Sequence, residues 1–149
     1  MSDPKQTFRH NYPIRVRSFH VDRQNVVHNL QYLYFFEEAR VEYIRQVGLA
    51  MDEGTFLTHD KFFVVKNSCE YAEPAVFDEQ LEIYTRISFV GDSSIGFEHL
   101  AVRSTGSVSA RGSHVFVHVD AESNTPSRVP DTLRDMIRAY EGERVLFRE

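Results

Sequence analysis

The sequence has one cysteine and no block of basic residues, and it lacks an apolar run of about 18 residues, the length that marks a membrane span. A lone cysteine, Cys69, excludes an internal disulfide and favours a reducing compartment. The N-terminal segment 1–13 is polar and has no apolar signal core. Together these absences predict a cytoplasmic protein without a membrane-spanning segment.

The charge balance narrows the range of partners. The net charge is −5, and acidic and basic residues are spread along the chain. We therefore expect neither a nucleic acid nor an anionic membrane surface as the main partner. The 149 residues fit one domain. We expect a single domain over residues 1–149, with residues 1–11 as a flexible tail.

Alternation of apolar and polar residues predicts several strands, and Gly- and Ser-rich turns separate them at hairpin spacing. In the clearest strand, five residues share one face: Leu81, Ile83, Thr85, Ile87 and Phe89. The predicted strands cover 12–19, 62–72, 80–90, 95–103 and 108–120. Asn25 tolerates a positive φ and predicts a tight turn after the first strand. Hairpin spacing indicates an antiparallel sheet.

A helix is predicted from about residue 29 to residue 47, followed by a loop at 49–61. Its first half is apolar on most faces, which is typical of a helix buried inside a structure. The apolar residues are Leu30, Tyr32, Leu33, Tyr34, Phe35, Phe36, Ala39, Val41, Tyr43 and Ile44. Gly48 can end this helix, and Pro130 suits the first turn of a second helix at 129–141.

These elements predict an α+β fold in which an antiparallel sheet wraps around one long buried helix. A single layer of this kind leaves strand edges and apolar surface exposed. We therefore expect a homodimer or a tetramer made of two dimers.

Asp22 lies seven residues before Asn29, at the start of the predicted helix. A helix N-terminus offers free N–H groups and a partial positive charge, so it favours developing negative charge. A carboxylate beside it can act as a base or nucleophile toward a carbonyl, while the Asn29 N–H binds the oxyanion. Spacing alone favours a plainer alternative, in which Asp22 forms a turn and Asn29 caps the helix.

The segment DRQNVVHNLQYLYFFEEAR, residues 22–40, resembles the active-site motif of hotdog-fold acyl-CoA thioesterases. The nearest branch holds 4-hydroxybenzoyl-CoA thioesterase and the Tol–Pal-associated thioesterase, with a motif of roughly D-x-x-G-V-V-Y-H-x-N-Y-L-x-Y-F-E-x-A-R. The matching residues are Asp22, Val26, Val27, Tyr32, Leu33, Phe36, Glu37, Ala39 and Arg40. The resemblance continues through 42–48 and 71–99 and covers most of the chain.

The resemblance implies a hotdog fold and hydrolysis of an acyl-CoA thioester to a free acid and CoA. It implies that Asp22 is the catalytic carboxylate and that the Asn29 backbone N–H polarises the thioester carbonyl, in a site at a dimer interface. We expect substrate contacts from Val27, His28, Tyr32 and Phe36. No cofactor is expected, because CoA is part of the substrate.

Three positions depart from the family motif. Asn25 replaces the motif Gly, Asn29 replaces the motif His, and Gln31 replaces the motif Asn. The loss of the imidazole leaves an alternative open, a protein that binds acyl thioesters without turnover. A hotdog hydratase or dehydratase is another alternative, although its His and acidic motif are not found. His28 either donates to the substrate or fills the position of the motif Tyr.

Other polar residues have plainer explanations. His114 and His118 share a strand face but are about 13 Å apart at ~3.3 Å per residue, too far to share one zinc ion, so no metal is expected. Glu37 and Arg40, three residues apart on the helix, are expected to form a local or an intersubunit ion pair. His20 is either a partner of Asp22 or a surface residue.

A second group of polar residues concerns the CoA phosphates and the protein surface. Arg86, Arg103 and Arg111 either cradle the phosphates or are solvated strand residues. Glu73 and Asp78 are expected in solvent, and Cys69 is expected to be a buried small residue rather than a nucleophile.

Overall fold

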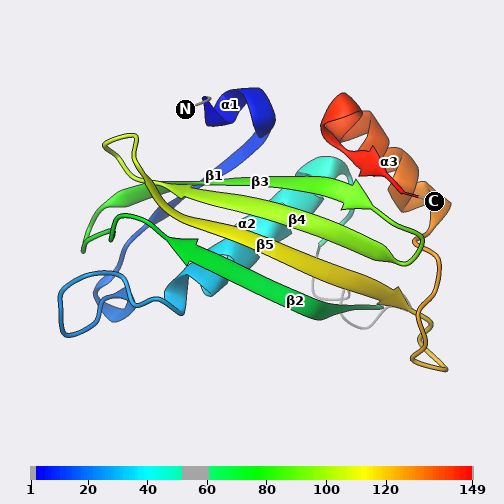
Figure 1. The fold of residues 1–149 in the computed structure, drawn as a ribbon, viewed down its shortest axis with the longest axis horizontal. Coiled ribbons are helices and arrows are strands. Elements are labelled where there is room, and N and C mark those ends of the chain that lie inside the picture. The colour runs from blue at the N-terminus through cyan, green and yellow to red at the C-terminus, as the bar shows by residue number, and fades with distance from the viewer. Residues whose placement is uncertain (1–2, 52–60, 149) are drawn as a thin grey trace.

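The computed structural model describes residues 3–51 and 61–148. The helices of this part are α1 (Pro4–Thr7), the 3₁₀ helix η1 (Ser18–His20), α2 (Gln31–Val47), α3 (Asp131–Glu141) and the 3₁₀ helix η3 (Gly142–Arg144). The strands are β1 (His10–Arg15), β2 (Lys61–Tyr71), β3 (Gln80–Val90), β4 (Ser94–Val102), β5 (Val108–Val119) and β6 (Leu146–Phe147). The strand order is β1-β3-β4-β5-β2, all antiparallel, and β6 adds a short parallel pairing to β3 (Figure 1).

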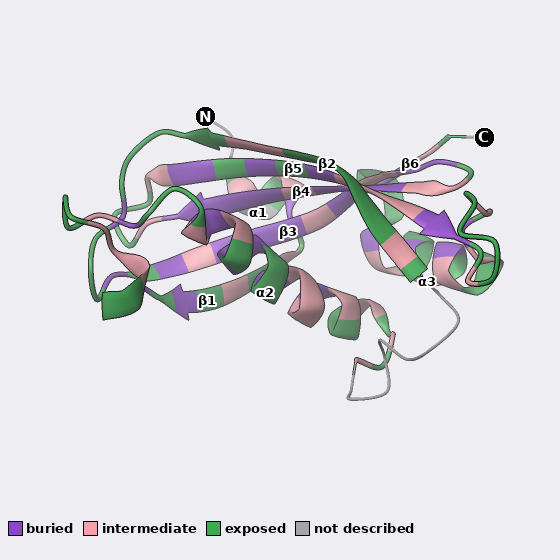
Figure 2. Cartoon of the chain, turned by 90° about the horizontal axis from the view of Figure 1, so that it is seen from below, coloured by how far each residue is buried: buried purple, intermediate pink, exposed green. Residues whose placement is uncertain are grey.

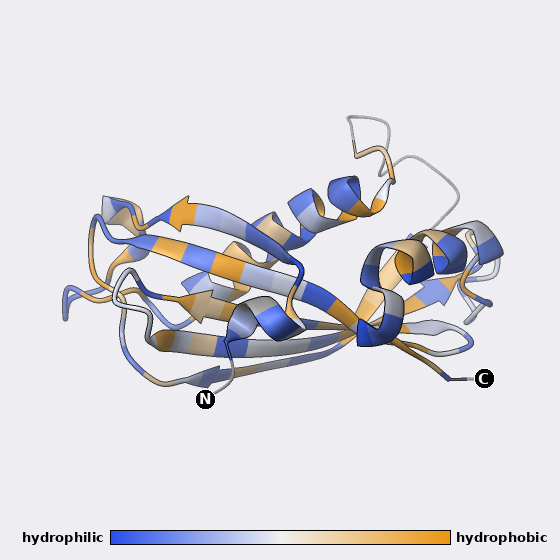
Figure 3. Ribbon diagram, turned by 90° about the horizontal axis from the view of Figure 1, so that it is seen from above, coloured by the Kyte–Doolittle hydropathy of each residue, from blue (hydrophilic) through white to orange (hydrophobic). Residues whose placement is uncertain are grey.

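The long helix α2 packs against one face of the sheet, as expected for the hotdog fold. Phe36 and Ala39 of the helix are fully buried in one cluster with Leu81 and Ile83 of β3. Successive strand residues point to opposite faces, and hydrophobic and hydrophilic positions alternate along the strands (Figure 3). The predicted antiparallel sheet around one long helix is confirmed.

A second core cluster lies at the far end of α2, where α3 covers the same face of the sheet (Figure 1). Tyr43 from α2 and Ile137 from α3 are both fully buried there with Ile87 and Val90 of β3. The apolar face of α3 therefore packs over the sheet and covers the core at this end of α2. In the described residues, no helix has both the length and the apolar character needed to cross a membrane.

The predicted flexible tail at 1–11 is wrong for most of its length. Residues Pro4–Thr7 form α1, and β1 begins at His10. Phe8 is buried with Tyr84, Leu100 and Val102 on the sheet face opposite α2. The segment is held because it covers apolar residues on that outer face, which local sequence does not reveal.

Element boundaries shift near the start of the chain. The strand predicted at 12–19 ends at Arg15 and is followed by η1. The long helix begins at Gln31, with Leu30 and not Asn29 at the cap position. Asn25 has φ 63° and Gly48 has φ 127°, which confirms the predicted turn and helix stop. The predicted loop at 49–61 lies largely outside the described residues.

The long helix is not buried on most faces of the single chain, and this prediction is wrong. Leu30 is 55% exposed and Tyr34 is 66% exposed. Figure 2 shows exposed segments along the side of α2 that faces away from the sheet. The residues that face the sheet are Tyr32, Phe35, Phe36, Ala39 and Tyr43. The remaining apolar surface is free to contact something outside this chain.

Phe89 departs from the face predicted for its strand. The register between β3 and β4 shifts between Ile87 and Phe89, and Phe89 then lies opposite Gly96. A Cβ on Gly96 would lie 2.1 Å from the Phe89 ring, so only glycine fits under it. This bulge turns Phe89 away from the core and releases the Ile87 N–H from the strand ladder.

Candidate active site

Residues 20–28 form a tight hairpin between η1 and α2. Val21 pairs with Val27, and the His28 N–H donates to the His20 carbonyl at 2.9 Å. At the turn, the Asp22 N–H donates to the Val26 carbonyl at 2.9 Å. The Asp22 carboxylate accepts a bond from the Gln24 N–H at 2.8 Å, which fixes it against the turn.

The hairpin register sorts its side chains onto two faces. Residues directly opposite each other in an antiparallel pair point to the same side. Val21 and Val27 therefore share one face, which packs into the core cluster beside α2. Asp22 and His28, each next to this pair in the chain, point to the other face, whereas His20 belongs to η1 and its ring packs against Phe35. Asp22 is half-buried and His28 is exposed.

The second strand of the hairpin runs directly into the start of α2. The His28 imidazole Nδ1 accepts the Leu30 N–H at 3.1 Å, and the His28 carbonyl accepts the Gln31 N–H at 2.9 Å. The Asn29 carbonyl accepts the Tyr71 hydroxyl at 3.0 Å. The Asn29 N–H has no acceptor among residues 3–51 and 61–148. The helix start thus leaves the Asn29 N–H available to a ligand, in a region of partial positive charge.

One contact of His28 assigns the roles of its ring nitrogens. Since Nδ1 accepts the Leu30 N–H, only Nε2 can carry a donating N–H in the neutral ring. His28 therefore bonds to the residue at the cap position of α2 and keeps Nε2 for another partner. Both alternatives predicted for His28, a filler and a donor to substrate, are compatible with this geometry.

Three of the residues expected to touch substrate lie in the core instead. Val27 is 5% exposed, Tyr32 2% and Phe36 0%. The Tyr32 hydroxyl lies 2.7 Å from the Ser109 hydroxyl, and the Phe36 ring stacks on His99 at 4.8 Å. In this chain the three side chains pack in the core behind the hairpin and the helix start. Their burial therefore argues against the predicted direct contact with substrate.

His20 does not contact the Asp22 carboxylate. Its Nδ1 accepts the Arg17 N–H at 2.8 Å, and its ring packs edge-on against Phe35 at 4.8 Å. Burial, together with the charge of Arg17, lowers the pKa of His20. His20 is therefore a packing residue at the base of the hairpin.

Exposed apolar side chains surround the hairpin and the helix start. Tyr71 reaches the Asn29 carbonyl, and Val76 pairs with Val26 of the hairpin. The exposed set is Phe19, Leu30, Tyr34, Tyr71, Val76 and Phe77. We call these six residues the apolar rim. Such a concentration on one surface marks a binding surface for a ligand or a partner.

Within the described residues of the single chain, Glu37 and Arg40 do not form the predicted local ion pair, and the intersubunit form stays a prediction. Arg40 instead turns toward the sheet, where it lies 3.3 Å from His99 and over the Phe116 ring at 4.8 Å. Burial lowers the pKa of Arg40 to about 10. Arg40, which matches the Arg of the motif, thus packs between α2 and the sheet.

The Arg40 contact fixes the state of a buried histidine. Arg40 can only donate, so Nε2 of His99 accepts and its proton lies on Nδ1, which faces Thr85 at 2.9 Å. His114 lies beside it, with ring centroids 5.2 Å apart. Burial, with the charge of Arg40, lowers the pKa of His99 and lowers the pKa of His114 to about 4. Both imidazoles are neutral at pH 7.

Sequence spacing drew attention to His114 and His118, but the structure pairs His114 with His99. The signal that was missed is the presence of Thr85 and His99 at inward positions of otherwise apolar strands. Within the described ranges, no group of three His, Cys, Asp or Glu residues is arranged to hold a metal ion. Cys69 is half-buried beside the core, and burial raises the pKa of its thiol.

The three candidate arginines do not converge. Arg86 pairs with Glu98 and donates to the Arg144 carbonyl, and Arg86 and Arg111 line a groove of about 640 Å³ on the outer face. Arg103 lies elsewhere, beside the loop between β2 and β3. A cradle made of all three is therefore contradicted. Glu73 and Asp78 are exposed, as expected, and each has one ion-pair partner.

Comparisons with known proteins agree with this geometry. The profile of the thioesterase-like superfamily matches residues 16–137. Acyl-CoA thioesterase YbgC of Haemophilus influenzae is 35% identical over 97 residues, which are 64% of this chain and 70% of the relative. Long-chain acyl-CoA thioesterase FadM of Escherichia coli (strain K12) is 30% identical over 127 residues, which are 83% of this chain and 93% of the relative.

A solved structure agrees over nearly the whole chain. A thioesterase from Thermus thermophilus, complexed with coenzyme A and Zn, superposes with a TM-score of 0.79 at 27% identity. The match covers 92% of this chain and 97% of that one. Because the family profile matches residues 16–137, which hold the hairpin, α2 and strands β2 to β5, this chain belongs to the thioesterase-like superfamily.

Proposed function

We propose that this protein hydrolyses an acyl-CoA thioester to a free acid and CoA. The observation that carries the proposal is the hairpin that ends in a helix start: Asp22 lies on its open face, and the Asn29 N–H that follows has no acceptor within the described ranges. Relatives named as acyl-CoA thioesterases support the substrate class. CoA enters as part of the substrate, so the reaction needs no separate cofactor.

In this mechanism the thioester carbonyl accepts the Asn29 N–H. The Asp22 carboxylate either removes a proton from the attacking water or attacks the carbonyl carbon itself. Both routes create a negative oxygen that the N–H and the partial positive charge of the helix stabilise. The oxyanion then collapses, the carbon–sulfur bond breaks and the CoA thiolate leaves. In the general-base route the product is the free acid, and the proton that Asp22 took from water passes to the thiolate. In the nucleophilic route the product is a mixed anhydride of Asp22 and the acyl group; the thiolate takes a proton from solvent, and water then hydrolyses the anhydride to the free acid and restores the Asp22 carboxylate.

A second copy of the chain is proposed to complete the site. β2 lies at one edge of the sheet, with Phe63, Val64 and Val65 exposed along it (Figure 2). An edge strand of this kind pairs readily with another strand. A homodimer through β2 accounts for the exposed edge, and covering the apolar rim in the assembly would enclose the acyl group.

Sedimentation tests the dimer. Val64→Asp places a charge on the exposed edge and is expected to shift the protein from dimer to monomer. Thr132→Asp, at an exposed position of α3 and not on the edge strand, is the matched control and should leave the sedimentation coefficient unchanged. A monomeric wild-type protein at micromolar concentration would contradict the proposal.

Release of free thiol from a panel of aromatic and aliphatic acyl-CoA esters tests the activity. Asp22→Asn is expected to lower kcat by about 10²–10⁴-fold, the typical contribution of a positioned acid or base, while the folded protein still binds the ester. Binding of acyl-CoA by a wild-type protein that cleaves none of the esters would replace hydrolysis by the non-catalytic alternative. Hydration of an enoyl-CoA ester without thiol release would instead favour the hydratase.

A further inference from the structure

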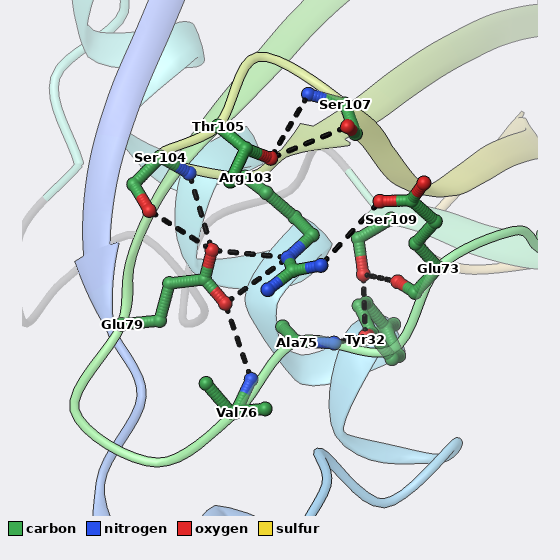
Figure 4. Close-up of polar contacts among 10 residues, drawn as sticks. All are labelled: Tyr32, Glu73, Ala75, Val76, Glu79, Arg103, Ser104, Thr105, Ser107 and Ser109. Carbon is green, nitrogen blue, oxygen red and sulfur yellow. Dashed lines mark hydrogen bonds and ion pairs between the residues drawn. The ribbon is translucent and has the colours of Figure 1, made fainter.

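A buried carboxylate lies next to the hairpin, in the loop that connects β2 and β3. The Glu79 side chain is 5% exposed. Its oxygens accept bonds from Arg103 Nε at 3.0 and 3.2 Å, from the Val76 N–H at 3.2 Å, and from Ser104 through N–H at 3.2 Å and hydroxyl at 3.1 Å (Figure 4). Burial raises the pKa of Glu79, but these bonds outweigh burial and lower it. Glu79 is therefore an ionised, fully satisfied anchor.

The first branch of this network leads to Asp22. The Val76 N–H that donates to Glu79 belongs to a residue that pairs with Val26, and the Val26 carbonyl accepts the Asp22 N–H at 2.9 Å. Two residues thus separate the Glu79 carboxylate from Asp22. The Glu79 carbonyl also accepts the Val16 N–H at 2.8 Å, just before the segment that enters the hairpin.

The second branch leads to the start of α2. Arg103 also pairs with Glu73 at 3.4 Å, and the Glu73 carbonyl accepts the Ser109 hydroxyl at 2.6 Å (Figure 4). The Ser109 hydroxyl lies 2.7 Å from the Tyr32 hydroxyl, which accepts the Ala75 N–H at 3.4 Å. Tyr32 is three residues after Asn29, so the same loop is bonded to the first turn of the helix.

We propose that Glu79 and Arg103 are positioning residues that hold the Asp22 hairpin and the start of α2 in the relative geometry that thioester hydrolysis requires. This inference rests on the proposed function of Asp22 and Asn29. A misplacement of about 1 Å costs up to ~10²-fold in rate, so reacting groups need rigid support behind them. The network supplies that support without touching the substrate.

The test compares two variants that each disturb a buried charged group. Glu79→Gln keeps the shape of the side chain and removes its charge. Arg134→Gln is the matched control, because Arg134 is also buried and donates to the Gly91 carbonyl at 2.6 Å, at the α3 end of the molecule. Each variant is measured for Tm and, in the presence of acyl-CoA, for kcat and KM of thiol release.

Glu79→Gln is expected to lower kcat by about 10-fold or more with little change in KM, while Arg134→Gln with a similar loss of Tm keeps kcat. In the Asp22→Asn background, Glu79→Gln should cause no further loss, because Glu79 acts through Asp22. Equal kcat values for Glu79→Gln and Arg134→Gln, or independent multiplying losses with Asp22→Asn, would show a purely structural role and overturn the proposal.

Two further measurements keep the test decisive. If Glu79→Gln does not fold, Ser104→Ala removes only the exposed hydroxyl donor and should give a smaller loss of kcat in the same direction; unchanged kcat overturns the proposal. If the wild-type protein cleaves no thioester, the proposed hydrolysis fails. Amide hydrogen exchange then tests the positioning role of Glu79 independently of any activity. The Asp22 and Val27 N–H groups should exchange faster in Glu79→Gln than in Arg134→Gln, and equal exchange rates overturn the positioning role.

Discussion

The two ends of α2 use similar residues in opposite ways. At the start, Leu30 and Tyr34 are exposed and the Asn29 N–H lacks an acceptor in the described part of the chain. At the far end, Tyr43 is fully buried under α3, and its hydroxyl donates to the buried carboxylate of Glu141. The start is left open to a ligand or a partner, whereas the far end is closed by the chain itself.

This difference separates function from stability along one helix. Tyr43 lies twelve residues after Gln31, about 18 Å along the axis at ~1.5 Å per residue. Substitutions at the start of α2 are therefore expected to lower kcat with little effect on the free energy of unfolding. Substitutions at the far end are expected to lower the free energy of unfolding with little effect on kcat.

Among changes within α2 and at its start, the largest expected effect concerns the Asn29 backbone. Asn29→Pro removes the N–H that is proposed to hold the oxyanion and should lower kcat by about 10²–10³-fold. Asn29→Ala keeps the N–H and is the matched control, expected to stay within a few-fold of the wild type. Circular dichroism checks that both variants fold. An equal loss in the two variants would assign the role to the side chain instead of the backbone.

An intermediate effect, on stability, is expected at the end of α2 that α3 covers. The Tyr43 hydroxyl donates to Glu141 and accepts the Ile87 N–H at 3.2 Å, and the other oxygen of Glu141 has no partner in the part of the chain described. Tyr43→Phe removes the hydroxyl bond to this buried carboxylate, while the Ile87 N–H keeps Glu141 as an acceptor at 3.3 Å, so the free energy of unfolding should fall by about 1–3 kcal/mol. Urea denaturation measures the loss, and kcat of the folded enzyme should be unchanged.

Tyr140→Phe is the control for this change. Its hydroxyl has no hydrogen-bond partner among the described residues, so the free energy of unfolding should stay within about 0.5 kcal/mol of the wild type. A loss of kcat in Tyr43→Phe, at temperatures where it stays folded, would show that the two ends are coupled and would break the comparison.

The open end was the harder one to predict from sequence. The positive φ of Asn25 and Gly48 and the strand at 80–90 follow from local signals, which the structure confirms. A helix that is apolar on nearly every side does not reveal which side meets the sheet. Tyr32 and Phe36 were therefore expected at the substrate, although they face the core.

Glu79 shows a second limit. It follows Asp78, an exposed turn residue, and nothing in the adjacent sequence distinguishes the two carboxylates. Its partners Arg103 and Ser104 are 24 and 25 residues away in the chain. Phe8 is a similar case, because its burial depends on Tyr84 and Leu100 from two strands of the sheet. Contacts of this kind appear only once the sheet has formed.

The smallest expected effect concerns the middle of α2, where His99 and His114 lie beneath the helix beside Arg40. An unfolded histidine takes up a proton near pH ~6.5, whereas the pKa of folded His114 is lowered to about 4 by burial and Arg40. Between these values the unfolded chain binds more protons than the folded one. Stability is therefore full above about pH 6.5 and falls as the pH drops toward about 4.

His114→Gln removes one of these titrating groups. Its Tm should fall less than that of the wild type between about pH 7 and pH 5, by about 2–4 °C, the shift expected for about 1 kcal/mol in a chain of this length. Thr132→Gln is the control, because Thr132 is exposed and carries no titrating side chain, so its Tm curve should parallel that of the wild type. Parallel Tm curves for wild type and His114→Gln would mean that His114 is already protonated beneath the helix, and the neutral support assigned to the middle of α2 would be wrong.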